Sequence, residues 1–339
     1  MKAFAPSVRP QNFLEMNKNY SVFVDQMYYY DFIALYNSWK YYECKVPIKV
    51  YSHANLSLER KKIISKHCDL IEVKNTLENK KTYKYKYLFK FLGILENMSD
   101  NEILLDADTI MLSNMDHLFD LTNKGLFFSV EEFPQKLAHG FHCKNKEEWA
   151  KEYLYVQNIL KKHVPNHYKK YNLNTQHPVY NAGLYGLNKI AHSELLQKSI
   201  EILQHDGFNN KNTVFQTEQY IFSFLAHLFN TPVVSLPPKE WMNTWDRHKT
   251  PKKNIVVNDG KLNLYNEDGT RVNFYHFTGD IGMIHKKMNL EMSCRPHQIF
   301  ETQPYEVYFN KKDVYSMWLE KHENPVILLY EMFARMGMN

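Results

Sequence analysis

Asp106 and Asp108 are separated only by Ala107 and directly follow the apolar run Glu102–Leu105. Such a run is typical of a buried central strand, and ligands of open α/β sheets bind at the carboxyl ends of the strands. Two carboxylates held together are costly unless a cation joins them, and oxygen ligands of this kind select Mg²⁺ or Mn²⁺. A diphosphate could complete the shell of that cation. Because the triplet is short, an ordinary solvated loop is the alternative interpretation.

Strands and helices are expected to alternate through the first hundred residues. Short apolar runs rich in strand-forming residues lie at 20–24, 46–51, 69–73 and 102–105. Helical spacing of apolar residues covers 31–42, 58–66 and 83–98. This alternation predicts a mainly parallel α/β sheet. Later strands are expected at 126–131, 182–187 and 272–277, helices at 147–163, 192–204 and 214–229, and a loop-rich stretch at 232–269.

The C-terminal stretch contains a strong helix signal. Asn324 is a good helix cap, and Pro325 suits the first helical position. Apolar residues lie on nearly every side of segment 326–336, which favours a helix buried against the rest of the chain; docking onto a membrane or a second subunit is the alternative. We therefore expect a lead-in at 1–17, a main domain at 18–290 and a helical C-terminal extension at 291–339.

Composition narrows the classes of protein to consider. The 339 residues, 44% of them hydrophobic, are enough for a large buried core. The net charge of +5 is spread without an Arg-rich block, so a nucleic-acid partner is not expected. The four cysteines are far apart, which favours free thiols. Neither a signal segment nor a membrane-spanning run is visible, so we expect a cytoplasmic protein; peripheral membrane contact and the oligomeric state stay open.

Five segments, in order, resemble the glycogenin-like retaining glycosyltransferases (glycosyltransferase family 8). They are ILLDADTIMLSNMDHLFD (103–120), NAGLYGLN (181–188), TEQYIF (217–222), WMN (241–243) and HFTG (276–279). The resemblance spans roughly residues 20–285. It implies a GT-A (Rossmann-like) fold, with a mixed, mainly parallel sheet flanked by helices. It also implies transfer of a hexose from a nucleotide sugar, with UDP as the family's nucleotide, to a glycan or other hydroxyl-bearing acceptor.

The resemblance assigns the metal ligands. Asp106, Asp108 and His276 would bind Mn²⁺ or Mg²⁺, with His276 as a neutral imidazole. The chain has 16 histidines, and His276 is distinguished by its place in HFTG. His139 and His142 have the spacing of a metal pair, but we interpret them as loop residues.

The resemblance also assigns the donor site. Its expected contacts are Asp25, Tyr28, Lys86, Lys90, Asp106, Ala107, Asp108, Asn181, Gly183, Gly279 and Lys286. Asp25 and Tyr28 would hold the nucleobase, although Tyr29 or Tyr30 could replace Tyr28. Lys86 and Lys90 lie four apart on one helix face, and spacing from Asp106 favours Lys90.

On the diphosphate side this chain departs from the family, which usually continues HFxG with Lys-Pro-Trp. The lysine that contacts the diphosphate would then be Lys286 or Lys287, reached through a longer loop, or would be missing.

An acid–glutamine pair is expected at the reacting face, here Glu218 and Gln219. The family usually has Asp where Glu218 stands. The resemblance implies retention, either by attack of a protein side chain or by front-face attack of the acceptor. Since an amide is a poor nucleophile, we favour the front-face route through an oxocarbenium-like transition state. Gln219 would then position the reactants, and Glu218 would bond donor hydroxyls. Asn243, in WMN, is a weak candidate for acceptor contact.

Two other functions fit part of the sequence. A haloacid-dehalogenase-type phosphohydrolase would use Asp106 as nucleophile, Asp108 as acid/base and Mg²⁺ as cofactor. Such a protein needs a later acidic motif, and Gly279-Asp280 begins one without a second acid. A non-catalytic binding protein on the same fold is the other alternative, although it would leave the acid pair without a purpose.

Overall fold

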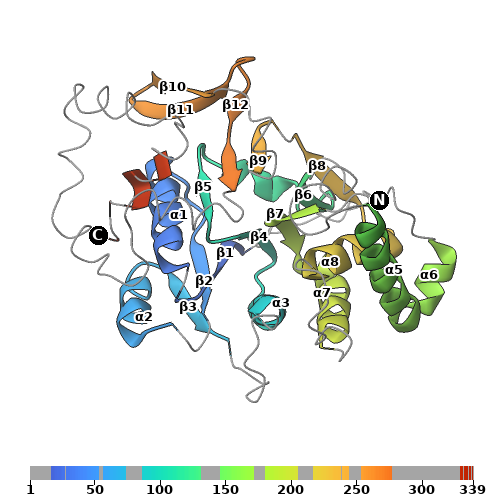
Figure 1. Cartoon of the computed structure of the whole chain (residues 1–339). Helices are drawn as coiled ribbons and strands as arrows, with labels where there is room; N and C mark the ends of the chain where they lie inside the picture. Colours follow the sequence, from blue (N-terminus) through green and yellow to red (C-terminus); the bar gives the residue numbers. More distant parts are fainter. Residues whose placement is uncertain are drawn as a thin grey trace, which may run out of the picture.

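A seven-stranded mixed sheet forms the centre of the molecule (Figure 1). This computed structural model describes residues 17–26, 28–52, 56–73, 86–130, 146–171, 180–204, 217–237, 239–243 and 253–276, and at the C-terminus 329, 330, 332–334, 336 and 338. The strand order is β3-β2-β1-β4-β7-β6-β8. The strands are β1 (Lys18–Val24), β2 (Ile48–Ser52), β3 (Asp69–Glu72), β4 (Asn101–Leu105), β6 (Leu126–Val130), β7 (Tyr180–Asn188) and β8 (Val233–Leu236).

Among the seven described strands of this sheet, β7 runs opposite to the others. It pairs antiparallel with β4 and β6, whereas the β1–β2, β1–β4, β2–β3 and β6–β8 pairs are parallel. The predicted α/β class with a mixed, mainly parallel sheet is confirmed. Because β1 and β4 run in parallel, their carboxyl ends meet at one edge of the sheet.

Helices cover both faces of the sheet (Figure 1). They are α1 (Tyr29–Tyr41), α2 (Leu58–Ile64), α3 (Lys86–Asn97), α5 (Lys146–His163), α6 (Pro165–Lys170), α7 (Lys189–Leu203) and α8 (Thr217–Leu228). Alternation along β4 explains the two layers, because Ile103 and Leu105 pack with α1 whereas Leu104 packs with α3, α5, α7 and α8. Among the described helices, none is long and apolar enough to cross a membrane.

Two small sheets accompany the central one in the described part of the chain. One has the order β5-β13-β9, formed by β5 (Thr109–Met111), β13 (Phe274–His276) and β9 (Trp241–Asn243). The other joins β10 (Lys253–Asn258), β11 (Lys261–Asn266) and β12 (Arg271–Val272). The predicted loop-rich stretch at 232–269 is therefore wrong. The clearest sequence signal for the β10–β11 hairpin was Asp259-Gly260. Two-residue turns of hairpins favour positive φ at both positions, and φ is 51° and 74° here.

The C-terminal segment packs beside α1 (Figure 1). An apolar cluster that includes residues of β5, β11, β12 and β13 also buries four residues of this segment: Leu329, Tyr330, Phe333 and Ala334. The side-chain amide of Asn37, in α1, donates to the Phe333 carbonyl at 2.8 Å. These described residues agree with the predicted packing of the segment against the rest of the chain. The three-part division at 17 and 290 stays a prediction, since residues 1–16 and 277–328 lie outside the described residues.

Candidate active site

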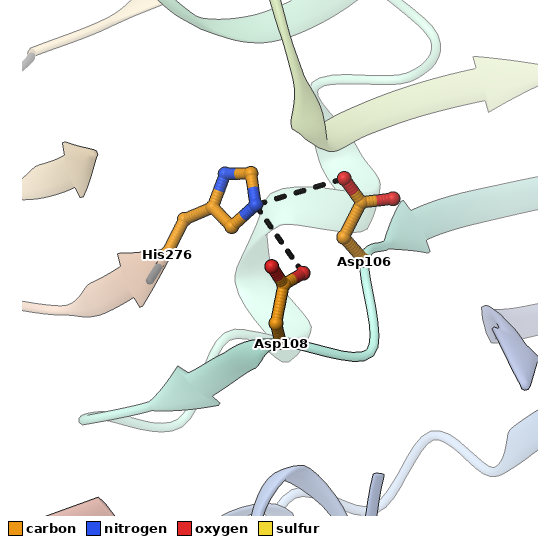
Figure 2. Close-up of side chains that lie close together, drawn as sticks. All are labelled: Asp106, Asp108 and His276. Carbon is orange, nitrogen blue, oxygen red and sulfur yellow. Dashed lines mark ion pairs between the residues drawn. The ribbon is translucent and has the colours of Figure 1, made fainter. Parts of the chain in front are cut away.

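The turn between β4 and β5 carries the two carboxylates (Figure 2). β4 ends at Leu105, and the Thr109 hydroxyl donates to the Asp106 carbonyl at 2.7 Å, which closes the turn. The Asp106 N–H donates to the Gly183 carbonyl at 3.0 Å and so ties the turn to β7. The side chains of Asp106 and Asp108 both point toward His276.

His276 reaches this turn through the small sheet. Antiparallel pairing of β13 with β5 places His276 opposite Thr109, the residue after Asp108. Its Nε2 lies 3.4 Å from Asp108 Oδ1 and 3.6 Å from Asp106 Oδ2 (Figure 2). One ligand atom from each of the three residues lies within 4.8 Å of the other two. This donor set could hold one divalent cation.

Burial and neighbouring charges shift the pKa values of His276 and Asp108 in opposite directions. Burial alone would lower the pKa of His276, but the carboxylates of Asp108 and Asp106 outweigh it and raise that pKa. Burial alone would raise the pKa of Asp108, but the His276 imidazole outweighs it and lowers that pKa. Both shifts favour a positive charge on His276 beside the carboxylates, so protonation of His276 and binding of a cation would compete here.

Lys90 adds a positive charge beside the carboxylates. Its ammonium donates a hydrogen bond to Asp106 Oδ1 and lies 5.4 Å from the centroid of the Tyr185 ring. The structure therefore brings Lys90 to the site. Lys86 is in the first turn of α3, but its side chain lies outside the described residues. Tyr185 was not predicted, although period-two alternation along β7 puts it on the face of Asn181 and Gly183.

Asn181 and Gly183 contact the histidine of the cluster. Asn181 Oδ1 lies 2.8 Å from His276 Nδ1 and accepts the Gly183 N–H at 2.7 Å. A Cβ on Gly183 would lie 2.1 Å from that same Nδ1. Both residues were predicted as donor contacts, and their contacts to His276 were not foreseen.

Asp25 and Tyr28 lie just beyond the carboxyl end of β1, at the edge shared with β4. Asp25 is buried and its Oδ1 accepts the Tyr28 N–H at 3.0 Å. The Arg60 guanidinium lies 4.5 Å from the Tyr29 ring centroid and 5.1 Å from that of Tyr30. Arg60 therefore covers part of both rings, and which of the three tyrosines would stack on a base stays a prediction.

Gln219 is buried in the first turn of α8. Its carbonyl accepts the Ser223 hydroxyl at 2.8 Å, and that hydroxyl accepts the Tyr180 N–H at 3.0 Å. These bonds attach α8 to the start of β7, next to Asn181.

The other predicted site residues are less fully described. Glu218 lies in α8 and Asn243 is paired with His276 in the β9–β13 register, but their side chains lie outside the described residues. Five further residues singled out from the sequence lie wholly outside the described part of the chain: Gly279, Lys286, Lys287, His139 and His142.

One protein-family model matches the chain. It is described as "Mannosyltransferase putative" and covers residues 21–196, which is more than half of the sequence. The matched region includes the Asp106–Asp108 turn and the Asn181–Gly183 strand. No curated protein matches the chain significantly.

Several solved glycosyltransferases are similar to the chain at low identity. An apo structure of the bifunctional enzyme WbbM is 15% identical with a TM-score of 0.43, over 82% of this chain and 47% of WbbM. An active-site mutant of LgtC is 12% identical with a TM-score of 0.45, over 77% of this chain and 87% of LgtC. Mouse xyloside xylosyltransferase 1, in its apo form, is 13% identical with a TM-score of 0.44, over 78% of this chain and 98% of that one. The chain thus spans about half the length of WbbM.

Proposed function

Because the chain belongs to the family described as "Mannosyltransferase putative", we propose that it transfers a hexose from a nucleotide sugar to a hydroxyl group. The observation that supports this most is the cluster of Asp106, Asp108 and His276 at the carboxyl end of β4. These three side chains would hold a divalent cation. When bound, the cation would stabilise the negative charge of the departing nucleoside diphosphate.

The donor set favours Mn²⁺ over Mg²⁺. Mg²⁺ prefers an octahedral shell of oxygen atoms, whereas His276 offers a nitrogen. Mannose is the first sugar to test because of the family's description, and UDP is expected only from the resemblance to glycogenin-like enzymes. The acceptor would be a glycan or another hydroxyl-bearing molecule.

We assign roles to the other site residues from their positions relative to the Asp106, Asp108 and His276 cluster. Lys90 would add positive charge where the donor diphosphate lies, since its ammonium is hydrogen-bonded to Asp106. Asp25 and Tyr28, at the end of β1, would hold the nucleobase. Gln219 would position the reactants, with Glu218 bonding the donor sugar. Transfer would proceed with retention, as the resemblance to glycogenin-like enzymes implies. Because an amide at 219 is a poor nucleophile, the acceptor hydroxyl would attack from the front face.

The test is the release of nucleoside diphosphate from GDP-mannose, UDP-glucose, UDP-galactose and UDP-N-acetylglucosamine, each with and without Mn²⁺. We expect Mn²⁺-dependent release from one donor, at least about 100-fold slower in Asp108→Asn. Asp120→Asn is the matched control, since Asp120 is exposed and its ion pair with Lys18, at 3.7 Å, lies on the surface. Cleavage of a generic phosphomonoester with Mg²⁺, and of no nucleotide sugar, would overturn the proposal and make Asp106 a nucleophile.

A further inference from the structure

We propose that Asn181 is a positioning residue that fixes the tautomer of His276 and so turns the lone pair of Nε2 toward Asp106 and Asp108. The inference rests on the proposed function, because it takes these three residues as the ligands of a cation. It gives Asn181 a task that does not involve contact with the donor sugar.

The hydrogen bonds of Asn181 assign the proton on His276. A backbone N–H can only donate, so the Asn181 atom that faces the Gly183 N–H at 2.7 Å must be the amide oxygen. The same oxygen lies 2.8 Å from His276 Nδ1. An oxygen without hydrogen cannot donate, and therefore Nδ1 must carry the proton of that bond.

This assignment decides what His276 can do at its other nitrogen. A neutral imidazole has one N–H, so a proton on Nδ1 leaves Nε2 as the acceptor. Nε2 is the atom that lies 3.4 Å from Asp108 and 3.6 Å from Asp106. The opposite tautomer would direct an N–H at the carboxylates and exclude a cation. The Asn181 bond stays the same whether Nε2 holds a proton or a cation, so the ring need not turn when the cation binds.

Burial makes this bond difficult to replace. Asn181 is 1% exposed and His276 is 3% exposed, so solvent water has little access to either side chain. If the amide were removed, the Nδ1 proton would lose its buried acceptor, and the ring would lose its preference for the productive tautomer. Partners of this kind on the second nitrogen of a metal-binding histidine typically change metal affinity by about 10- to 100-fold.

The experiment compares Asn181→Leu, which has a similar size and no acceptor, with Asn181→Asp, which keeps an acceptor for Nδ1. Mn²⁺ alone is titrated into each protein, and free Mn²⁺ is followed by electron paramagnetic resonance. We expect Asn181→Leu to bind Mn²⁺ about 10- to 100-fold more weakly than the wild type, and Asn181→Asp to bind at least as tightly. The tautomer of His276 is read from ¹⁵N-histidine spectra at high pH, with the signals of His276 assigned by comparison with His276→Gln. The ring should be protonated on Nδ1 in the wild type. This preference should be lost in Asn181→Leu.

Equal Mn²⁺ binding by the wild type and a folded Asn181→Leu, with one tautomer in both, overturns the role of Asn181 and leaves the proposed function standing. Absence of Mn²⁺ binding by the wild type overturns the cation site itself, and this role with it. If Asn181→Leu does not fold, the role of Asn181 is tested by Mn²⁺ binding to Asn181→Asp and by the wild-type spectrum. A wild-type His276 protonated on Nε2, or weak Mn²⁺ binding by a folded Asn181→Asp, contradicts the inference.

Discussion

A Cβ atom built on Gly183 would lie 2.1 Å from Nδ1 and 2.5 Å from Cε1 of His276, so any side chain at this point of β7 would enter the imidazole ring. Gly183→Ala should therefore displace the ring from its position beside Asp106 and Asp108. A shift of about 1 Å in such a site commonly costs about 100-fold in rate. We expect Mn²⁺ affinity and donor turnover to fall at least about tenfold. Titration with Mn²⁺ and the nucleotide-sugar assay measure the two effects.

Gly269→Ala is the control for general destabilisation. At Gly269 φ is +80° and nothing lies within 4 Å of the added atom, so the cost is local backbone strain. This variant should lose some thermal stability while Mn²⁺ affinity stays unchanged. If Gly183→Ala binds Mn²⁺ like the wild type, the imidazole has room to move and the close approach has no functional consequence.

Replacing Lys90 should weaken donor binding and turnover. Lys90 is buried, hydrogen-bonded to Asp106 and close to the Tyr185 ring, so Lys90→Gln removes positive charge from a place that water barely reaches. A charge-assisted hydrogen bond contributes about 1.5–3 kcal/mol, which corresponds to roughly a 10- to 100-fold fall in kcat/KM. Lys198→Gln, on a surface pair with Glu201, is the matched control and should behave like the wild type. Equal kcat/KM for both variants would remove Lys90 from the donor site.

The sequence was informative where the signal is local. The apolar run before Asp106, bounded by acids, predicts β4 because a central strand is buried on both faces. The alternating segments predict β1 to β3 and α1 to α3 within a few residues, and the structure confirms them. The acid pair likewise identifies the carboxyl end of β4 as the place of the cluster.

Contacts between distant segments could not be predicted in the same way. The register that puts His276 opposite Thr109 depends on β5 and β13, each only three residues long and too short to show a period. The side chain of Lys90 contacts Asp106, but its sequence spacing separates it only weakly from Lys86. The contact between Asn181 and His276 joins β7 and β13, which belong to two different sheets, so no single stretch of sequence carries it.

His192 should make the stability of the protein depend on pH. It is buried in α7 and its Nδ1 accepts the Asn188 N–H at 2.8 Å; burial lowers its pKa from 6.5 to about 4. A lowered pKa means that the folded state disfavours the proton, so the contribution of His192 is complete above pH 6.5 and is lost as pH falls toward 4. The loss should amount to roughly 3 kcal/mol. Urea unfolding of wild type and His192→Gln across this range isolates the effect, and parallel curves would contradict it.

Tyr330 should stabilise the docked C-terminal segment. Its fully buried hydroxyl donates to the buried carboxylate of Asp31 in the first turn of α1, and burial, followed by the charge of Asp31, raises the pKa of Tyr330 well above its usual value. Tyr330→Phe keeps the ring and removes one donor from a carboxylate that water does not reach. The free energy of unfolding should fall by about 1–3 kcal/mol, measured by urea denaturation.

Tyr265→Phe is the matched control, because it also removes a tyrosine hydroxyl but leaves the bond between Tyr330 and Asp31 intact. The Tyr265 hydroxyl accepts from the exposed Asn258 amide at 3.3 Å in the β10–β11 hairpin, where water can replace the bond. Its removal should change the free energy of unfolding by less than about 0.5 kcal/mol. Should Tyr330→Phe cost no more than Tyr265→Phe, the apolar contacts of Phe333 and Leu329 must hold the segment without help from Asp31. A larger cost for Tyr330→Phe would instead show that the hydrogen bond to Asp31 in α1 helps to hold the C-terminal segment.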